Sequence, residues 1–382
     1  MNPLTRTAAA LAVAVLLAAC GVTPPKPAAT GNTGNTGHTG HTGQQAAPVT
    51  SPLRDGERFM SLTMAEPYTP SAPGGGTDDY RCFVIDPGLT EQAFLTGAQF
   101  QPQNAEIVHH AIFFRLSPEQ AAEANRRDQS TPGQGWTCFG DAGIEEAAWV
   151  AHWAPGTNEV LLDSAYGYPM PPGSKLVMQV HYNTLNVEGK SGSDRSGIRL
   201  RVTGKKVKEL NTALFPAPVE LPCTKEESGP LCDRETAVKD VGRRFGQGSE
   251  AQVGGLAEAC GKPKPGPTQH CDFPIEGPVK VHALAGHMHL LGRSIKVELN
   301  PGTDKARTLL DVPKYNFDDQ ALRPLPEPVT ADKGDVVRVT CTHDAKLRSM
   351  LPELSKLEPR YVVWGEGTSD EMCLGIVIVS QT

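Results

Sequence analysis

Short strand-like runs dominate the folded part of this 382-residue chain. They are rich in β-branched and aromatic residues, and glycine, proline, asparagine or aspartate separates them. The clearest runs are 107–116, 176–182, 198–203, 280–285, 294–299, 336–342, 361–364 and 374–379. Helical composition is found in 118–127 and 235–245. Many short strands with few helices predict an all-β fold built from antiparallel β-sandwiches.

Proline-rich stretches suggest how these strands are divided. Prolines crowd residues 213–222 and 263–278, and we therefore expect a domain boundary near residue 206. This division gives an N-terminal domain of residues 53–205 and a C-terminal domain of residues 206–382. A cysteine-rich insertion, 216–275, is expected to be long and irregular.

The first residues have the pattern of an export signal. An apolar run, 8–19, follows Arg6 and is too short to span a bilayer, so residues 1–19 are predicted to be a signal peptide. The run ends in Leu17-Ala18-Ala19-Cys20-Gly21, which is similar to a bacterial lipobox, and Cys20 is the predicted lipidation site. The alternative is an ordinary secretory signal with a chance cysteine.

A lipidated Cys20 predicts an exported protein anchored in the bacterial cell envelope. Gly21 after the cysteine favours the outer membrane if the host is Gram-negative. Residues 20–52 contain a Gly/Thr/Asn tripeptide repeat without apolar residues to bury, which is typical of a disordered linker. The net charge of −7 and the lack of a basic run argue against a nucleic-acid partner.

Eight cysteines remain when Cys20 is set aside. They are Cys82, Cys138, Cys223, Cys232, Cys260, Cys271, Cys341 and Cys373. An even number in an exported protein indicates four disulfides, two of them local to the insertion. No C-x-x-C pair occurs in the sequence, which weakens a zinc or thiol-redox interpretation.

Six side chains have the chemistry of copper ligands. They are His109, His110, His181, His287, His289 and Met372. A thioether is a soft ligand that favours Cu(I), so histidines combined with methionine suit copper better than zinc. In a strand His287 and His289 share a face, and the small Ala283 and Ala285 on that face leave room for a metal.

Each part of this set has a plainer interpretation as well. Adjacent strand residues face opposite sides, so His109 and His110 can share one metal only if the backbone is twisted or bulged. Otherwise one is buried and the other lies at the surface. A methionine in an apolar strand is usually a core residue, but the polar flank before Met372 makes it a poor core candidate. A bridge between Cys341 and Cys373 would fix its strand.

Taken together, the motifs resemble those of a known family. They are His109-His110, Gln179-Val180-His181-Tyr182, His287-Met288-His289-Leu290-Leu291-Gly292 and Ser369-Asp370-Glu371-Met372-Cys373. In this order they resemble the copper type II, ascorbate-dependent monooxygenases. The resemblance implies two jelly-roll domains in tandem that hold two coppers per chain across a solvent-filled cleft. It implies that the three-histidine copper relays electrons and that the His-His-Met copper binds O2.

The resemblance makes a copper-dependent monooxygenase the leading hypothesis for function. Its expected partners are O2, a small-molecule reductant such as ascorbate, and a small-molecule substrate, and we expect a monomer. Peptidylglycine hydroxylases of the family have an arginine where this chain has Ala285, and substrate-binding residues where it has Leu374 and Ile376. A peptide carboxylate would therefore lose its charge-assisted bonds. The alternatives are a non-catalytic copper lipoprotein for storage, sensing or delivery, and a binding domain with vestigial ligands.

Overall fold

The computed structural model describes residues 50–382 except 74–76, 156, 158 and 185–191. The predicted signal peptide, Cys20 and most of the predicted linker lie outside the described residues. Within them, none of the helices is long and apolar enough to cross a membrane. The boundary predicted near residue 206 stays a prediction.

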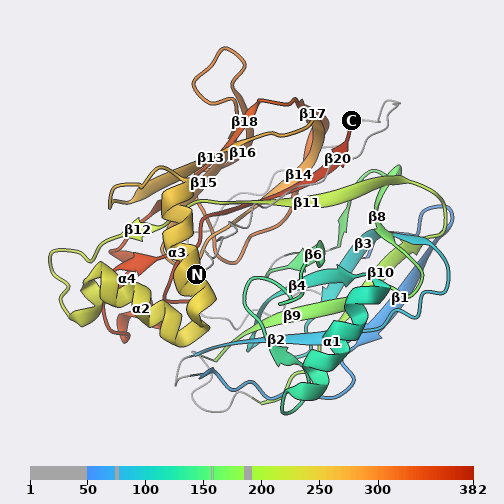
Figure 1. The fold of residues 1–382 in the computed structure, drawn as a ribbon, viewed down its shortest axis with the longest axis horizontal. Coiled ribbons are helices and arrows are strands. Elements are labelled where there is room, and N and C mark those ends of the chain that lie inside the picture. Colours follow the sequence, from blue (N-terminus) through green and yellow to red (C-terminus); the bar gives the residue numbers. More distant parts are fainter. Residues whose placement is uncertain (1–49, 74–76, 156, 158, 185–191) are drawn as a thin grey trace, which may run out of the picture.

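Two β-sandwiches follow one another along the chain, so the predicted all-β class is confirmed. One five-stranded sheet belongs to the N-terminal half (Figure 1). Its strands in spatial order are β5 (Trp136–Thr137), β2 (Asp78–Ile85), β9 (Lys175–Asn183), β4 (Val108–Leu116) and β6 (Ala148–Trp153). All pairs in this sheet are antiparallel.

A nine-stranded sheet runs through both halves. Its strands in spatial order are β1 (Glu57–Thr63), β10 (Gly197–Thr203), β3 (Ala93–Gln101), β8 (Tyr166–Met170), β11 (Lys208–Pro216), β20 (Leu374–Gln381), β14 (Val279–His287) and β17 (Arg323–Ala331), and β7 (Val160–Leu161) pairs with β3. Figure 1 shows β11 crossing from the blue-green N-terminal half to the orange-red C-terminal half. A short parallel contact between β8 and β11 joins the two parts of this sheet.

The C-terminal sandwich is completed by a four-stranded antiparallel sheet. Its strands are β13 (Thr268–Pro274), β18 (Val336–His343), β15 (Gly292–Leu299) and β16 (Arg307–Val312), and a small pair is formed by β12 (Glu220–Leu221) and β19 (Val362–Val363). Each sandwich has its own hydrophobic core, one built from residues between Met60 and Val202 and the other from residues between Phe215 and Val379. Burial of apolar surface between facing sheets is the main stabilising contribution.

The helices lie at the edges of the sandwiches. They are α1 (Pro118–Ser130), the 3-10 turn η2 (Pro230–Cys232), α2 (Arg234–Phe245), α3 (Gln247–Ala259), α4 (Leu347–Met350) and α5 (Pro352–Ser355). The insertion is less irregular than expected: besides α2, which the helical composition of 235–245 indicated, α3 and β13 lie within it. Gly248, Gly254 and Gly255 lower the intrinsic helix propensity of α3, and its packing through Val253 into the apolar cluster that also includes α2 compensates.

All eight cysteines are paired. The disulfides are Cys82–Cys138, Cys223–Cys232, Cys260–Cys271 and Cys341–Cys373. This is the number that the even count indicated, with two local bridges in the insertion. The last bridge joins the end of β18 to the start of β20, directly after Met372.

Candidate metal centre

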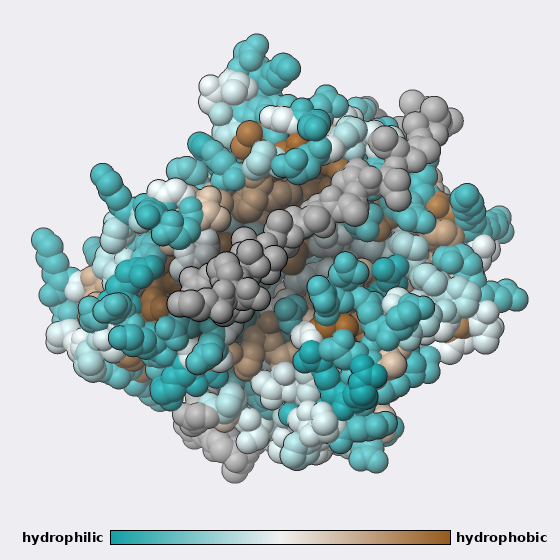
Figure 2. Space-filling view, in the orientation of Figure 1, coloured by the Kyte–Doolittle hydropathy of each residue, from teal (hydrophilic) through white to brown (hydrophobic). Residues whose placement is uncertain are grey.

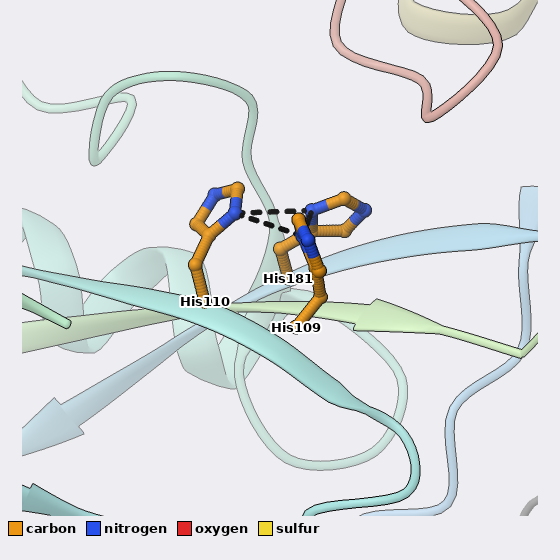
Figure 3. A group of neighbouring side chains, drawn as sticks. All are labelled: His109, His110 and His181. Carbon is orange, nitrogen blue, oxygen red and sulfur yellow. Dashed lines mark hydrogen bonds between the residues drawn. The ribbon is translucent and has the colours of Figure 1, made fainter. Parts of the chain in front are cut away.

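Three histidines of the five-stranded sheet point toward one another, and we call them the first histidine group: His109, His110 and His181 (Figure 3). The first two lie on β4 and the third on the neighbouring strand β9. The register between these strands shifts between Val108 and His110, so His109 is an extra residue in a β-bulge. This bulge is the condition under which adjacent strand residues can share a metal.

The ring nitrogens of this group form a small triangle. The Nδ1–Nδ1 distances are 3.0 Å between His109 and His181, 3.1 Å between His109 and His110, and 3.3 Å between His110 and His181. Three ligands at about 2.0–2.1 Å from one first-row metal ion leave similar spacings between them. The geometry therefore fits a metal ion held by three Nδ1 atoms.

A buried carboxylate sets the protonation of His181. Nε2 of His181 lies 2.9 Å from Oδ1 of Asp78, and both side chains are buried. Because the carboxylate accepts a hydrogen bond from Nε2–H, the neutral ring presents the lone pair of Nδ1 to the triangle. Burial opposes the charge on Asp78, but the hydrogen bonds from His181 and Thr368 hold the pKa of its carboxyl below the usual value.

Burial keeps the histidines neutral. It lowers the pKa of His109 and of His110 well below the ordinary value, and the neighbouring rings lower both further. It also lowers the pKa of His181, although Asp78 opposes the shift. Neutral imidazole is the form that binds metal ions.

The other three predicted ligands form the second ligand group: His287, His289 and Met372. His287 is the last residue of β14, and His289 lies in the turn beyond it, so the expectation that both sit in one strand was wrong. Their ring centroids are nevertheless 5.2 Å apart. The position of His289 is set by hydrogen bonds to the loop that precedes β20, not by strand periodicity.

Both imidazoles of the second ligand group direct Nε2 away from their protein partners. Nδ1 of His287 lies 2.6 Å from Oε1 of Gln320, and Nδ1 of His289 lies 3.1 Å from the carbonyl oxygen of Asp370. Both partners are acceptors, so Nδ1 donates and Nε2 keeps its lone pair. Nε2 of His289 is buried without a hydrogen-bond partner. A metal ligated by Nε2 would satisfy it.

Glu371 connects the His-Met-His segment to Met372. Its buried carboxylate accepts the backbone N–H groups of His289 at 2.8 Å, Leu291 at 2.6 Å and Met372 at 3.2 Å. Met372 is buried in an apolar cluster that includes Ala285, Leu374 and Ile376. One carboxylate thus holds the backbones of two predicted ligands together.

The two groups lie next to each other. The ring centroids of His110 and His287 are 5.6 Å apart, and the ring of His109 stacks on Phe317 at 4.4 Å. The solvent-filled cleft implied by the resemblance is therefore absent between these described side chains. The hydroxyl of Thr368 donates to Asp78 at 2.5 Å, and this bond is one of those that hold the C-terminal loop against the N-terminal half.

Sequence reasoning missed the residues that orient these ligands. They are Asp78, Tyr80 and Gln320. Tyr80 stacks on His181 with ring centroids 4.0 Å apart, and its hydroxyl donates to the carbonyl of Glu366. No local pattern in the sequence marked these residues as partners of the ligands.

The buried histidines should make the metal-free fold sensitive to acid. Burial lowers the pKa of His287 to about 3 and that of His152 to about 4. The unfolded chain takes up these protons near pH 6.5, so the free energy of unfolding falls as the pH drops from about 7 to about 4. His152→Gln is expected to reduce this slope by at most about 1.4 kcal/mol per pH unit. Denaturant unfolding of both metal-free proteins measures it; parallel slopes would contradict the prediction.

Comparison with known proteins relates part of the chain to a family of copper enzymes. Residues 267–379 match the family model "Copper type II ascorbate-dependent monooxygenase, C-terminal domain". The chain is distantly similar to this family. The match includes the second ligand group and leaves out the first histidine group, α2 and α3.

Two animal enzymes are related along most of the chain. Human dopamine beta-hydroxylase is 25% identical over 284 residues, 72% of this chain and 38% of that protein. Tyramine beta-hydroxylase of Caenorhabditis briggsae is 24% identical over 289 residues, 72% of this chain and 40% of that protein. The chain thus spans about two fifths of the length of these relatives. Among solved structures, the major capsid protein P2 of bacteriophage PM2 aligns with 8% identity and a TM-score of 0.29, covering 85% of this chain and 97% of that chain.

Proposed function

We propose that this protein is a copper-dependent monooxygenase that hydroxylates a C–H bond of a small neutral substrate. The overall reaction consumes O2, two electrons and two protons, and it produces the alcohol and water. The electrons come from an external small reductant, ascorbate or its equivalent. We also propose that Cys20 anchors the protein in the bacterial cell envelope and that it acts there as a monomer.

One observation carries the proposal: three Nδ1 atoms lie 3.0–3.3 Å apart in a homologue of a copper family. The first histidine group would hold one copper and the second ligand group another. Copper in such sites supplies one-electron redox chemistry and O2 activation. The chain itself orients the ligands, through Asp78 at the first group and through Gln320 and Glu371 at the second.

A partly open cavity lined by residues of both halves supports a neutral substrate. It measures about 70 Å³ and is lined by Trp149, Ala151, His152, Leu322 and Ile378 among others. Among the described residues of its lining none is Asp, Glu, Lys or Arg, and the lowered pKa of His152 keeps that ring neutral at pH 7. Desolvating a charged substrate without a partner is costly.

Leu322 links the cavity lining to the second ligand group. Leu322 follows two residues after Gln320, the partner of His287, and it packs in the same apolar cluster as Met372. Figure 2 shows hydrophobic residues gathered between the two halves on the face that it presents. A cavity of about 150 Å³ accepts benzene, so this smaller one fits an apolar end group of a few carbon atoms.

Oxygen consumption by the copper-loaded protein tests the function. Small neutral molecules, each paired with its carboxylate analogue, are supplied with ascorbate in an oxygen electrode. We expect uptake that depends on a neutral substrate, with one O2 consumed per alcohol formed. The carboxylate analogues should have kcat/KM values at least about 10-fold lower. Two bound coppers without substrate-dependent uptake would favour the non-catalytic copper-binding lipoprotein.

A cavity-filling substitution tests the proposed substrate position. Ala151→Leu adds three carbon atoms to the cavity lining on β6 and is expected to raise KM for the neutral substrate at least about 10-fold. Ala148→Leu is the matched control, because Ala148 lies on the same strand but does not line the cavity. Equal KM values in the two variants would place the substrate elsewhere.

A further inference from the structure

Helix α2 of the insertion contacts the loop that carries Met372. Arg244, in its last turn, makes a two-pronged ion pair with Asp370: Nη1 lies 2.7 Å from Oδ2 and Nη2 lies 2.6 Å from Oδ1. The Arg244 side chain is 11% exposed and that of Asp370 2%, so this pair is largely shielded from water. Paired charges in such surroundings are held in one geometry.

Asp370 transmits this contact to the second ligand group through its main chain. Its carbonyl oxygen accepts the Nδ1–H of His289 at 3.1 Å. It precedes Glu371, which accepts the backbone N–H groups of His289 and Met372. A shift of Asp370 would therefore displace both an imidazole and the thioether-bearing residue.

The surrounding residues leave Arg244 little freedom. Its Nε donates to Asp240 at 2.7 Å, and Asp240 also accepts from Arg360 at 2.9 Å. A Cβ atom on Gly367 would lie 2.7 Å from Nη1 of Arg244, so the loop approaches the guanidinium where a larger residue would collide. Phe245, the next residue, packs in the apolar cluster of Met372.

We propose that Arg244 is a positioning residue for the second ligand group, an inference that rests on the proposed copper function. By fixing Asp370, Arg244 holds His289 and Met372 where they can share one metal ion. Helix α2 lies in the cysteine-rich insertion, outside the residues that match the family model. The disulfide Cys223–Cys232 ties the segment just before the helix.

The matched variants are Arg244→Gln and Arg243→Gln in the full-length protein. Both arginines pair with Asp240, but Arg243 is 63% exposed and, within the described part of the chain, forms an ion pair with Asp240 alone. Cu(I) is titrated against a competing chelator, and copper–sulfur scattering is measured by X-ray absorption. Arg244→Gln is expected to weaken the second copper about 10–100-fold and to diminish the sulfur signal. The first copper should be unchanged, and Arg243→Gln should match the wild type.

Hydrogen exchange of the metal-free protein gives a readout that does not depend on copper. Arg244→Gln should accelerate exchange of the backbone amides of His289, Leu291 and Met372, whose partner is Glu371. If Arg244→Gln does not fold, Arg244→Lys replaces it, because lysine keeps the positive charge but cannot make the two-pronged ion pair of the planar guanidinium. Wild-type exchange and affinity in the Arg244 variant would overturn the inference. A wild-type protein that binds fewer than two coppers would instead overturn the proposed function.

Discussion

Replacing His287 by alanine is expected to lower bound copper from two equivalents to one and to abolish substrate-dependent oxygen uptake. His287 supplies one of three predicted ligands, and its Nδ1 is fixed by Gln320 so that Nε2 is free to bind. With two remaining ligands, one of them a weak thioether, the site loses most of its affinity for copper. Elemental analysis of the purified protein and an oxygen electrode measure the two effects.

The matched control is His282→Ala on the same strand. His282 is buried and its Nε2 lies 2.8 Å from the hydroxyl oxygen of Ser380, well before the metal-binding end of β14. It should keep both coppers and the activity. Two coppers in His287→Ala would place the second copper elsewhere. Loss of both would show that the adjacent rings of His110 and His287 hold interdependent metals.

Local sequence patterns predicted the class of the fold because side chains alternate between the two faces of a strand, so a few residues are enough to show the pattern. The run 176–182 became β9, whose alternate side chains Leu176, Met178 and Val180 enter the N-terminal core. The same alternation turns His181 to the opposite face, beside the bulge in β4. The bulge was recognised as a requirement, but the register shift that creates it depends on pairing between β4 and β9.

The environment of the ligands was much less accessible to sequence. Asp78 and Thr368 are separated by 290 residues, and their contact exists only because the loop before β20 packs on β2. His289 was assigned by strand periodicity, although the strand ends at His287 and the carboxylate of Glu371 determines the path of the turn. Such long-range hydrogen bonds leave no local pattern.

The insertion shows the limit of composition as a guide. Its prolines and cysteines suggested irregular backbone outside 235–245, whose helical composition is confirmed by α2; this helix begins at a side-chain cap in which Asp233 accepts the N–H of Thr236. The helix then buries Val241 and Phe245 in the cluster of Met372. Tertiary packing thus gives the segment its structure, and it brings Arg244 to a site that no local signal connects with it.

Replacing Asp78 by asparagine is expected to weaken the first copper by about 10–100-fold, the usual cost of removing a hydrogen-bond partner from a ligating histidine. The carboxylate of Asp78 accepts a hydrogen bond from Nε2–H of His181, so the lone pair of Nδ1 is the one available to the metal. A neutral amide accepts the hydrogen bond from Nε2–H less strongly, and the ring can then adopt the other tautomer, which points an N–H into the triangle. Cu(I) affinities of both sites measure the effect.

Two controls separate the role of Asp78 from general destabilisation. Asp79→Asn removes the neighbouring buried carboxylate. This carboxylate accepts hydrogen bonds from the hydroxyl of Tyr68 and the backbone N–H of Ser71, which are not predicted ligands. Thr368→Val removes the hydroxyl that donates a hydrogen bond to Asp78, but it leaves the hydrogen bond between Asp78 and His181. If orientation of His181 is the cause, only Asp78→Asn weakens the first copper. Equal losses in all three variants would mean that the packing between the halves, rather than the tautomer of His181, controls copper affinity.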